Sequence, residues 1–204
     1  MQKPIIIEFT GTPNSGKTTL LKALNEILPT AGIKSIVMQE DAEIVPKVIP
    51  KKTWTRNVWI TLGQLQSLLE AKYHDEDVIF LDRGYYDALF WAGFFCKQNI
   101  CTFDESDSLI KMLNELDKHF SIKPDYLFVF DVSAEESVRR RQKQSNEPTT
   151  MSNDSFITAY RNELNQFIEK LDVNIVRFDT TDMSMLEMEA DALSAIVEIL
   201  KSKK

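Results

Sequence analysis

Two hydrophobic patterns alternate along this chain. Short runs of consecutive apolar residues are typical of strands buried on both faces, whereas apolar residues that recur every three or four positions are typical of helices with one buried face. The predicted strands are residues 4–10, 33–38, 78–81, 126–130 and 173–178. Because helical segments separate these strands, the pattern predicts an α/β fold of three layers (α/β/α) with a five-stranded, mostly parallel sheet.

Helical periodicity accounts for most of the remaining chain. The predicted helices cover residues 20–28, 54–74, 85–97, 109–120, 133–141, 156–171 and the segment after residue 184. Ser133–Glu136 and Ser184–Glu187 both have the Ser-x-x-Glu form of a capping box, which predicts a helix start at each point. Residues 42–53 are not expected to form a continuous helix, because they include Pro46 and Pro50.

A glycine-containing segment lies between the first predicted strand and the first predicted helix. Residues 11–18 read Gly-Thr-Pro-Asn-Ser-Gly-Lys-Thr and fit G-x-x-x-x-G-K-[ST], the phosphate-binding loop. The glycines let the backbone curl so that successive N–H groups point at one anion, and the following helix directs its positive N-terminus there. Lys17 is expected to bridge the β- and γ-phosphates. The residues predicted to bind the nucleotide are Gly11, Thr12, Pro13, Asn14, Ser15, Gly16, Lys17, Thr18 and Thr19.

Two oxygen-bearing side chains are predicted to hold Mg²⁺. The Thr18 hydroxyl is one, and Asp82 is the other, because it ends the apolar strand 78–81 where enzymes with this loop place a Mg²⁺-organising acid. The alternative is an aspartate that only caps the next turn. Right-handed crossovers bring the carboxyl ends of parallel strands to one edge, so Gly11, Glu40 and Asp82 are expected along it.

Composition narrows the class of protein further. The chain has 204 residues, of which 43% are hydrophobic and 27% charged, as expected for a globular α/β domain. The net charge of −7 argues against nucleic acid as the main partner. No apolar run is long enough to cross a bilayer, and the N-terminal apolar stretch ends at Glu8, so neither a membrane span nor a signal peptide is predicted. Cys96 and Cys101 are predicted to be free thiols, which favours a cytoplasmic location.

Three motifs occur together: the loop at residues 11–18, the pair Asp82-Arg83 after a strand, and the arginines at 139–141. In combination they resemble the nucleoside and nucleotide kinases, the group that includes thymidylate kinase and the deoxynucleoside kinases. The string Asp-Arg-Gly-Tyr-Tyr-Asp at 82–87 also resembles the kinase-like ATPase domains related to ribosylnicotinamide kinase. Residues 130–141 resemble the strand and lid-helix start of the thymidylate-kinase-like branch.

The resemblance implies catalytic roles for several arginines. Arg83 would clamp phosphate or acceptor, because a guanidinium offers a planar fork to phosphate oxygens. Arg139, Arg140 and Arg141 follow one another at about 100° steps around a helix, so one or two of them would reach the transferring phosphoryl group. Arg139 and Arg140 are the candidates. The alternative is a solvated basic helix face.

The resemblance also implies a catalytic base. Glu40 follows the second strand, where deoxynucleoside kinases place the carboxylate that accepts the sugar hydroxyl proton. Asp41 and Glu43 compete for this role. The aromatic residue that usually follows this carboxylate closely is missing, since the next tryptophan is Trp54, and this leaves the acceptor open.

The chain is therefore predicted to be a single kinase-like domain over residues 1–204, with a mobile lid around residues 139–154. The predicted activity is ATP- and Mg²⁺-dependent transfer of the γ-phosphoryl group to a small acceptor, with a nucleoside or nucleotide favoured. The sequence is compatible with a homodimer. The alternatives are a regulatory ATPase or switch without a small acceptor and a nucleotide-binding module of a larger assembly. No Asn-Lys-x-Asp string is present to read guanine, which disfavours a GTPase.

Overall fold

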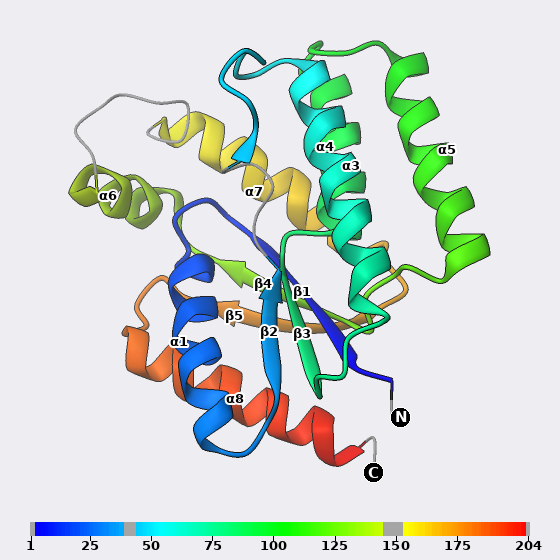
Figure 1. The fold of residues 1–204 in the computed structure, drawn as a ribbon. Coiled ribbons are helices and arrows are strands. Elements are labelled where there is room, and N and C mark those ends of the chain that lie inside the picture. Colours follow the sequence, from blue (N-terminus) through cyan, green and yellow to red (C-terminus); the bar gives the residue numbers. More distant parts are fainter. Residues whose placement is uncertain (1–2, 39–43, 145–152, 203–204) are drawn as a thin grey trace. The chain divides into compact units, whose positions relative to one another are not determined.

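The protein is an α/β structure built on a five-stranded parallel sheet, as the sequence predicts (Figure 1). A computed structural model describes residues 3–38, 44–144 and 153–202. The strands are β1 (Ile5–Gly11), β2 (Ser35–Met38), β3 (Val78–Asp82), β4 (Tyr126–Asp131) and β5 (Asn174–Asp179). Their order in the sheet is β2-β3-β1-β4-β5. All five predicted strands are confirmed, with ends shifted by one or two residues.

The chain divides into two compact units. The first unit contains Met1–Phe9 and Ser35–Tyr126, and the second contains Thr10–Lys34 and Leu127–Lys204. Strand β1 therefore begins in the first unit and ends in the second. The assignment of residues 1–204 to one kinase-like domain stays a prediction.

In the first unit, β3 pairs in parallel with both β1 and β2, and Asp82 lies opposite Phe9. The helices of this unit are α3 (Trp54–Ala71), α4 (Tyr85–Lys97) and α5 (Phe103–Phe120), and α4 packs against both of the others (Figure 1). Tyr85, Tyr86 and Phe90 are buried on α4, so these aromatic side chains belong to the core.

Helix α5 begins earlier than its hydrophobic periodicity predicts. Thr102 caps it, because the Thr102 hydroxyl accepts from the Glu105 N–H at 3.2 Å and the Glu105 carboxylate accepts from the Thr102 N–H at 2.8 Å. This reciprocal capping box satisfies two groups that the first turn would otherwise leave without partners. The cap therefore adds a polar, exposed first turn to the amphipathic segment.

The second unit contains α1 (Lys17–Thr30), α6 (Ala134–Gln144), α7 (Asp154–Ile168) and α8 (Met185–Ser202). Helix α1 packs against α8, and α6 packs against α7. The core between β4 and β5 is aromatic, and the rings of Phe130 and Phe178 are stacked with centroids 4.6 Å apart. No helix of the described residues is long and apolar enough to cross a membrane.

One of the two predicted capping boxes forms only in part. At α8 both halves are present, since Ser184 and Glu187 exchange hydrogen bonds in both directions. At α6 the Ser133 hydroxyl accepts from the Glu136 N–H at 3.2 Å, but the Ser133 N–H donates to the Thr181 hydroxyl instead of to Glu136. The Glu136 carboxylate binds arginines of its own helix, and this competition explains the difference.

Candidate functional site

The segment 11–18 has the backbone shape of an anion-binding loop. Gly11 (φ 140°), Asn14 (φ 59°) and Gly16 (φ 94°) all lie at positive φ, so the chain reverses direction several times before α1 begins. Gly11 is required for a second reason. A Cβ at this position would lie 2.0 Å from the carbonyl oxygen of Phe130 on β4, so no side chain fits there. The two glycines therefore have the conformational role that the motif predicts.

Lys17 is buried, with only 6% of its surface exposed, and its ammonium group lies against the loop. The Lys17 Nζ donates to the carbonyl oxygens of Gly11 (3.3 Å) and Thr12 (3.0 Å) and to the Ser15 hydroxyl (3.1 Å). Its positive charge therefore lies within the segment that the sequence predicts to bind phosphate. Thr18 is half-buried at the start of α1, and Thr19 is exposed.

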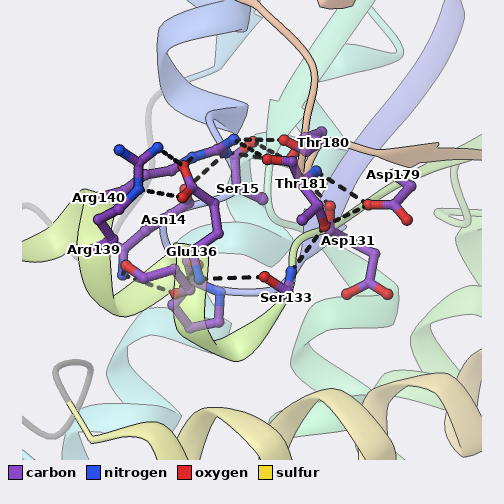
Figure 2. A network of polar contacts seen from close by, with 12 residues as sticks. Asn14, Ser15, Asp131, Ser133, Glu136, Arg139, Arg140, Asp179, Thr180 and Thr181 are labelled. Atoms are coloured by element: carbon purple, nitrogen blue, oxygen red, sulfur yellow. Dashed lines mark hydrogen bonds and ion pairs between the residues drawn. The ribbon is translucent and has the colours of Figure 1, made fainter.

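The outward carbonyl groups of the loop are bound by three side chains from two distant segments, α6 and the residues after β5, and Figure 2 shows two of them, Arg140 and Thr180. The Ser137 hydroxyl on α6 donates to the Pro13 carbonyl at 2.7 Å, and the Thr180 hydroxyl after β5 is 3.0 Å from the Ser15 carbonyl. Between them, the Arg140 guanidinium lies 3.4 Å from the Asn14 carbonyl, which makes this the longest of the three contacts. The loop is therefore fixed from outside by the C-terminal half of the chain.

A fourth anchor acts through Asp131, at the end of β4. Its carboxylate accepts from the Thr12 hydroxyl at 2.8 Å and from the Arg161 guanidinium on α7, with Nε–O distances of 2.7 and 2.8 Å. Burial acts to raise the pKa of Asp131, but the hydrogen bonds from Arg161 and Thr12 and the charge of Arg161 outweigh it and hold the pKa below its ordinary value. Asp131 is therefore a charged link between the loop and α7.

The arginines of α6 do not all face the loop. Arg139 and Arg140 both bind the Glu136 carboxylate, and these hydrogen bonds lower the pKa of Glu136 to about 2 (Figure 2). The Arg139 side chain is 58% exposed, whereas that of Arg140 is 21% exposed and also contacts the loop. Arg141 is half-buried. The structure thus distinguishes three neighbours that the sequence presents as equivalent.

In the first unit, the Asp82-Arg83 pair forms a tight turn between β3 and α4. Asp82 is buried, and Arg83 takes a left-handed backbone conformation (φ 73°) that is costly for a residue with a side chain. The Arg83 N–H donates to the Phe9 carbonyl at 3.1 Å, and its guanidinium pairs with the buried carboxylate of Asp87 at 3.4 Å. This strained turn is held by β1 on one side and by α4 on the other.

Glu8 is a buried acid on β1, opposite Leu81 of β3, that the sequence reasoning did not single out. Its carboxylate is fully buried and accepts hydrogen bonds from the backbone N–H groups of Tyr86 (3.0 Å) and Asp87 (2.7 Å), at the start of α4. Gly84 makes room for it, since a Cβ at that position would lie 2.9 Å from the Glu8 Oε2. Burial raises the pKa of Glu8 to about 8, although the two backbone hydrogen bonds oppose this shift. The sequence feature that could have drawn attention to Glu8 is its position as an acidic residue within an otherwise apolar strand.

Several residues with predicted roles lie outside the part of the chain that the structure describes. Glu40 and its competitors Asp41 and Glu43 lie outside the described residues, as do residues 145–152 of the predicted lid. Their roles stay predictions. Among the residues that the structure describes, no group of three or more His, Cys, Asp or Glu side chains could hold a metal ion.

A family model described as an AAA domain matches residues 6–170. The match covers most of the chain and includes the loop, the Asp82-Arg83 turn and the α6 arginines. The chain therefore belongs to this family of P-loop domains.

Individual relatives narrow the class to P-loop kinases. The probable thymidylate kinase of Sulfurisphaera tokodaii is 27% identical over 148 residues, which cover 69% of this chain and 70% of the relative. The thymidylate kinase of Chlorobium phaeobacteroides is 22% identical over 220 aligned positions, which cover 98% of this chain and 96% of the relative.

The fold is shared with a solved deoxynucleoside kinase. The deoxyadenosine kinase from M. mycoides, solved with the products dCMP and a flexible dCDP, matches with a TM-score of 0.75 and 14% identity over 95% of this chain and all of the other. A second structure of that enzyme, with dATP bound, matches with the same TM-score and 13% identity over 94% of this chain and 99% of the other. At these identities, the likeness establishes the fold alone.

Proposed function

We propose that this protein is an ATP- and Mg²⁺-dependent phosphotransferase that moves the γ-phosphoryl group to a nucleoside or nucleotide. The observation that carries the proposal is the buried Lys17 ammonium held inside a loop whose positive φ angles suit anion binding. The names of the relatives support a nucleotide acceptor. The same loop fits the phosphates of a nucleotide donor.

Donor binding is assigned to the loop and the start of α1. The backbone N–H groups of residues 11–18 would cradle the β-phosphate, and Lys17 would exchange its present carbonyl partners for β- and γ-phosphate oxygens. That exchange is favourable because a phosphate carries a full negative charge, whereas a carbonyl oxygen carries only a partial one. Catalysis would then consist mainly of positioning and of stabilising charge on the transferring group.

Thr18 and Asp82 are the proposed protein ligands of Mg²⁺. Hydroxyl and carboxylate oxygens are the hard ligands that this ion prefers, and Mg²⁺ in such enzymes takes its other ligands from phosphates and water. When bound, the ion would neutralise charge on the donor phosphates.

The acceptor side is assigned to Arg83 and Glu40. Asp87 holds the Arg83 guanidinium, so Arg83 is pre-positioned to bind a phosphate or a ribose oxygen. Glu40 would accept the proton of a hydroxyl acceptor, and Arg139 of the lid helix, whose side chain is 58% exposed, would stabilise the transferring phosphoryl group. We place the enzyme in the cytoplasm.

The experiment is a measurement of ATP consumption with Mg²⁺ against a panel of acceptors: deoxynucleosides, deoxynucleoside monophosphates and nicotinamide riboside. We expect one acceptor to raise turnover at least tenfold and to yield a phosphorylated product by mass spectrometry. Lys17→Ala should reduce turnover by at least 100-fold because the phosphate contact is lost. Circular dichroism should stay unchanged, because the hydrogen bonds that this side chain donates to Gly11, Thr12 and Ser15 lie within the loop and are not the backbone hydrogen bonds of a helix or of the sheet. Lys22→Ala, which removes an exposed lysine of the same helix, is the matched control.

Two outcomes would contradict the proposal. Slow hydrolysis that no acceptor accelerates would favour a regulatory ATPase. Wild-type turnover in the Lys17→Ala variant would show that the loop is not the donor site.

A further inference from the structure

Three consecutive backbone carbonyls of the loop, those of Pro13, Asn14 and Ser15, accept hydrogen bonds from side chains outside it. Figure 2 shows the contacts of Asn14 and Ser15. A peptide unit has its carbonyl and its N–H on opposite sides. When a side chain holds a carbonyl outward, the N–H of the same peptide unit must therefore point inward. These contacts thus determine the direction of the N–H groups that a phosphate-binding loop presents.

Arg140 is the residue that joins these contacts. Its Nη1 lies 3.4 Å from the Asn14 carbonyl and 3.2 Å from the Thr180 hydroxyl, and its Nη2 donates to the Thr180 carbonyl. Its Nε donates to Glu136 at 2.8 Å, which fixes the guanidinium plane from the other side. All three nitrogens are therefore directed at protein acceptors on α6, on the loop and on the segment after β5.

Thr180 completes the connection. It is fully buried, its N–H donates to the Asp131 carbonyl at 2.8 Å, and its hydroxyl lies 3.0 Å from the carbonyls of Ser15 and Asp131. Because the hydroxyl has one proton, it donates to one carbonyl at a time, and its lone pairs accept from Arg140. Arg140 thereby fixes the position of the hydroxyl, whose proton is left for the carbonyls of Ser15 and Asp131.

We propose that Arg140 is a positioning residue for donor binding. It acts through Thr180 and the Asn14 carbonyl to hold the loop in its phosphate-binding shape, and it does not touch the transferring phosphoryl group. The proposal rests on the assignment of the loop as the donor site. It separates Arg140 from its neighbours Arg139 and Arg141, which lack these contacts to the loop among the described residues.

The energetics favour this role over direct catalysis. To reach a phosphoryl group, Arg140 would have to leave the Glu136 carboxylate and the Thr180 carbonyl together. Hydrogen bonds that involve a charged group are stronger than neutral ones, and the abandoned buried carbonyls would be left without a donor. A half-buried arginine fixed from two sides is thus better suited to hold a shape than to move during a catalytic cycle.

The test measures binding of ADP with Mg²⁺ by isothermal titration calorimetry, together with steady-state kinetics. Arg140→Ala and Thr180→Val should each weaken ADP binding about tenfold, the effect of losing roughly one such hydrogen bond. Arg140→Lys should lie between them and the wild type, because one ammonium can replace only part of the fork. The donor KM should rise in parallel, while kcat at saturating donor and the acceptor KM change less than threefold. Gln142→Ala, an exposed position on the same helix, should bind ADP within twofold of the wild type.

Each contrary result has a distinct meaning. Wild-type ADP affinity in Arg140→Ala with a kcat lowered 100-fold would make Arg140 a direct phosphoryl contact and would overturn the proposal. If Arg140→Lys and Thr180→Val lower the melting temperature but leave the ADP affinity unchanged, the contacts serve only the stability of the fold. That result would also overturn the proposal. If the wild type binds no ADP, the loop is not the donor site and the proposed function itself fails. The titration of the wild type shows this before any variant is compared.

Discussion

Burial in the interior of a protein makes the charged form of a carboxyl group unfavourable, because the charge loses its contact with water. Glu8 has no exposed surface, and the partners that the structure gives it are the backbone N–H groups at the first turn of α4. Asp87, close by, adds like charge and favours the protonated form of Glu8 further. The result is a titratable group in the interior that changes charge near neutral pH rather than at acidic pH.

Glu8→Gln should make stability less dependent on pH. The pKa of Glu8 is raised from an ordinary value of 4.5 to about 8, so the folded state holds this proton more tightly than the unfolded state. The stabilisation is complete below about pH 4.5 and is lost as the pH rises through about 8. The variant lacks this loss, so its free energy of unfolding relative to the wild type should rise by on the order of a few kcal/mol from pH 5 to pH 9.

Urea unfolding at several pH values, followed by tryptophan fluorescence, measures this difference. Glu26→Gln, at an exposed position on α1, is the control. Parallel pH profiles for the wild type and Glu8→Gln would contradict the shifted pKa.

At the scale of single elements, caps decide where helices begin. Hydrophobic periodicity alone starts α5 at Leu109, but the helix begins at Phe103 because Thr102 and Glu105 satisfy its first turn. At α6 the Ser-x-x-Glu motif forms only half of a capping box, because the Glu136 carboxylate accepts hydrogen bonds from Arg139 and Arg140 instead of from the Ser133 N–H. A short motif is therefore a guide to a helix start only when no stronger partner competes for its acid.

Thr102→Ala should destabilise the protein by about 1 kcal/mol, the usual cost of losing an N-cap hydroxyl. The matched control is Ser108→Ala within the same helix, at an exposed position. That change should stabilise by a few tenths of a kcal/mol, because alanine is the better helix former. Thermal unfolding of both variants measures these changes in stability. A Thr102→Ala variant that is no less stable than Ser108→Ala would show that the capping box does not support α5.

For the whole molecule, the strands β3 and β4 could be predicted most directly, because each is an apolar run that ends at an aspartate. The loop could be predicted because its residues are contiguous. Its supports could not, since Ser15 and Thr180 are 165 positions apart and Pro13 and Ser137 are 124 apart. No local pattern marks a serine or threonine that will meet a distant carbonyl, and the roles of Asp131 and Arg161 are invisible for the same reason.

Donor binding should stabilise the entire fold. A ligand that binds only the folded state at 100 times its Kd contributes about 2.7 kcal/mol, which for a chain of this size corresponds to a rise in Tm of roughly 5–10 °C. We expect this rise with ADP and Mg²⁺ in differential scanning fluorimetry and expect it to vanish in Lys17→Ala. An equal rise in that variant would mean that ADP binds elsewhere.

The long sequence separation between the loop and its supports also has a consequence for synthesis. The hydroxyl that holds the Ser15 carbonyl belongs to Thr180, which the ribosome adds 165 residues after Ser15. At about 5–20 residues per second, the gap lasts roughly 8–30 s. Throughout that interval the nascent chain carries a complete loop sequence without the side chains that shape it. A growing chain therefore lacks this support of the loop until Thr180 has been added.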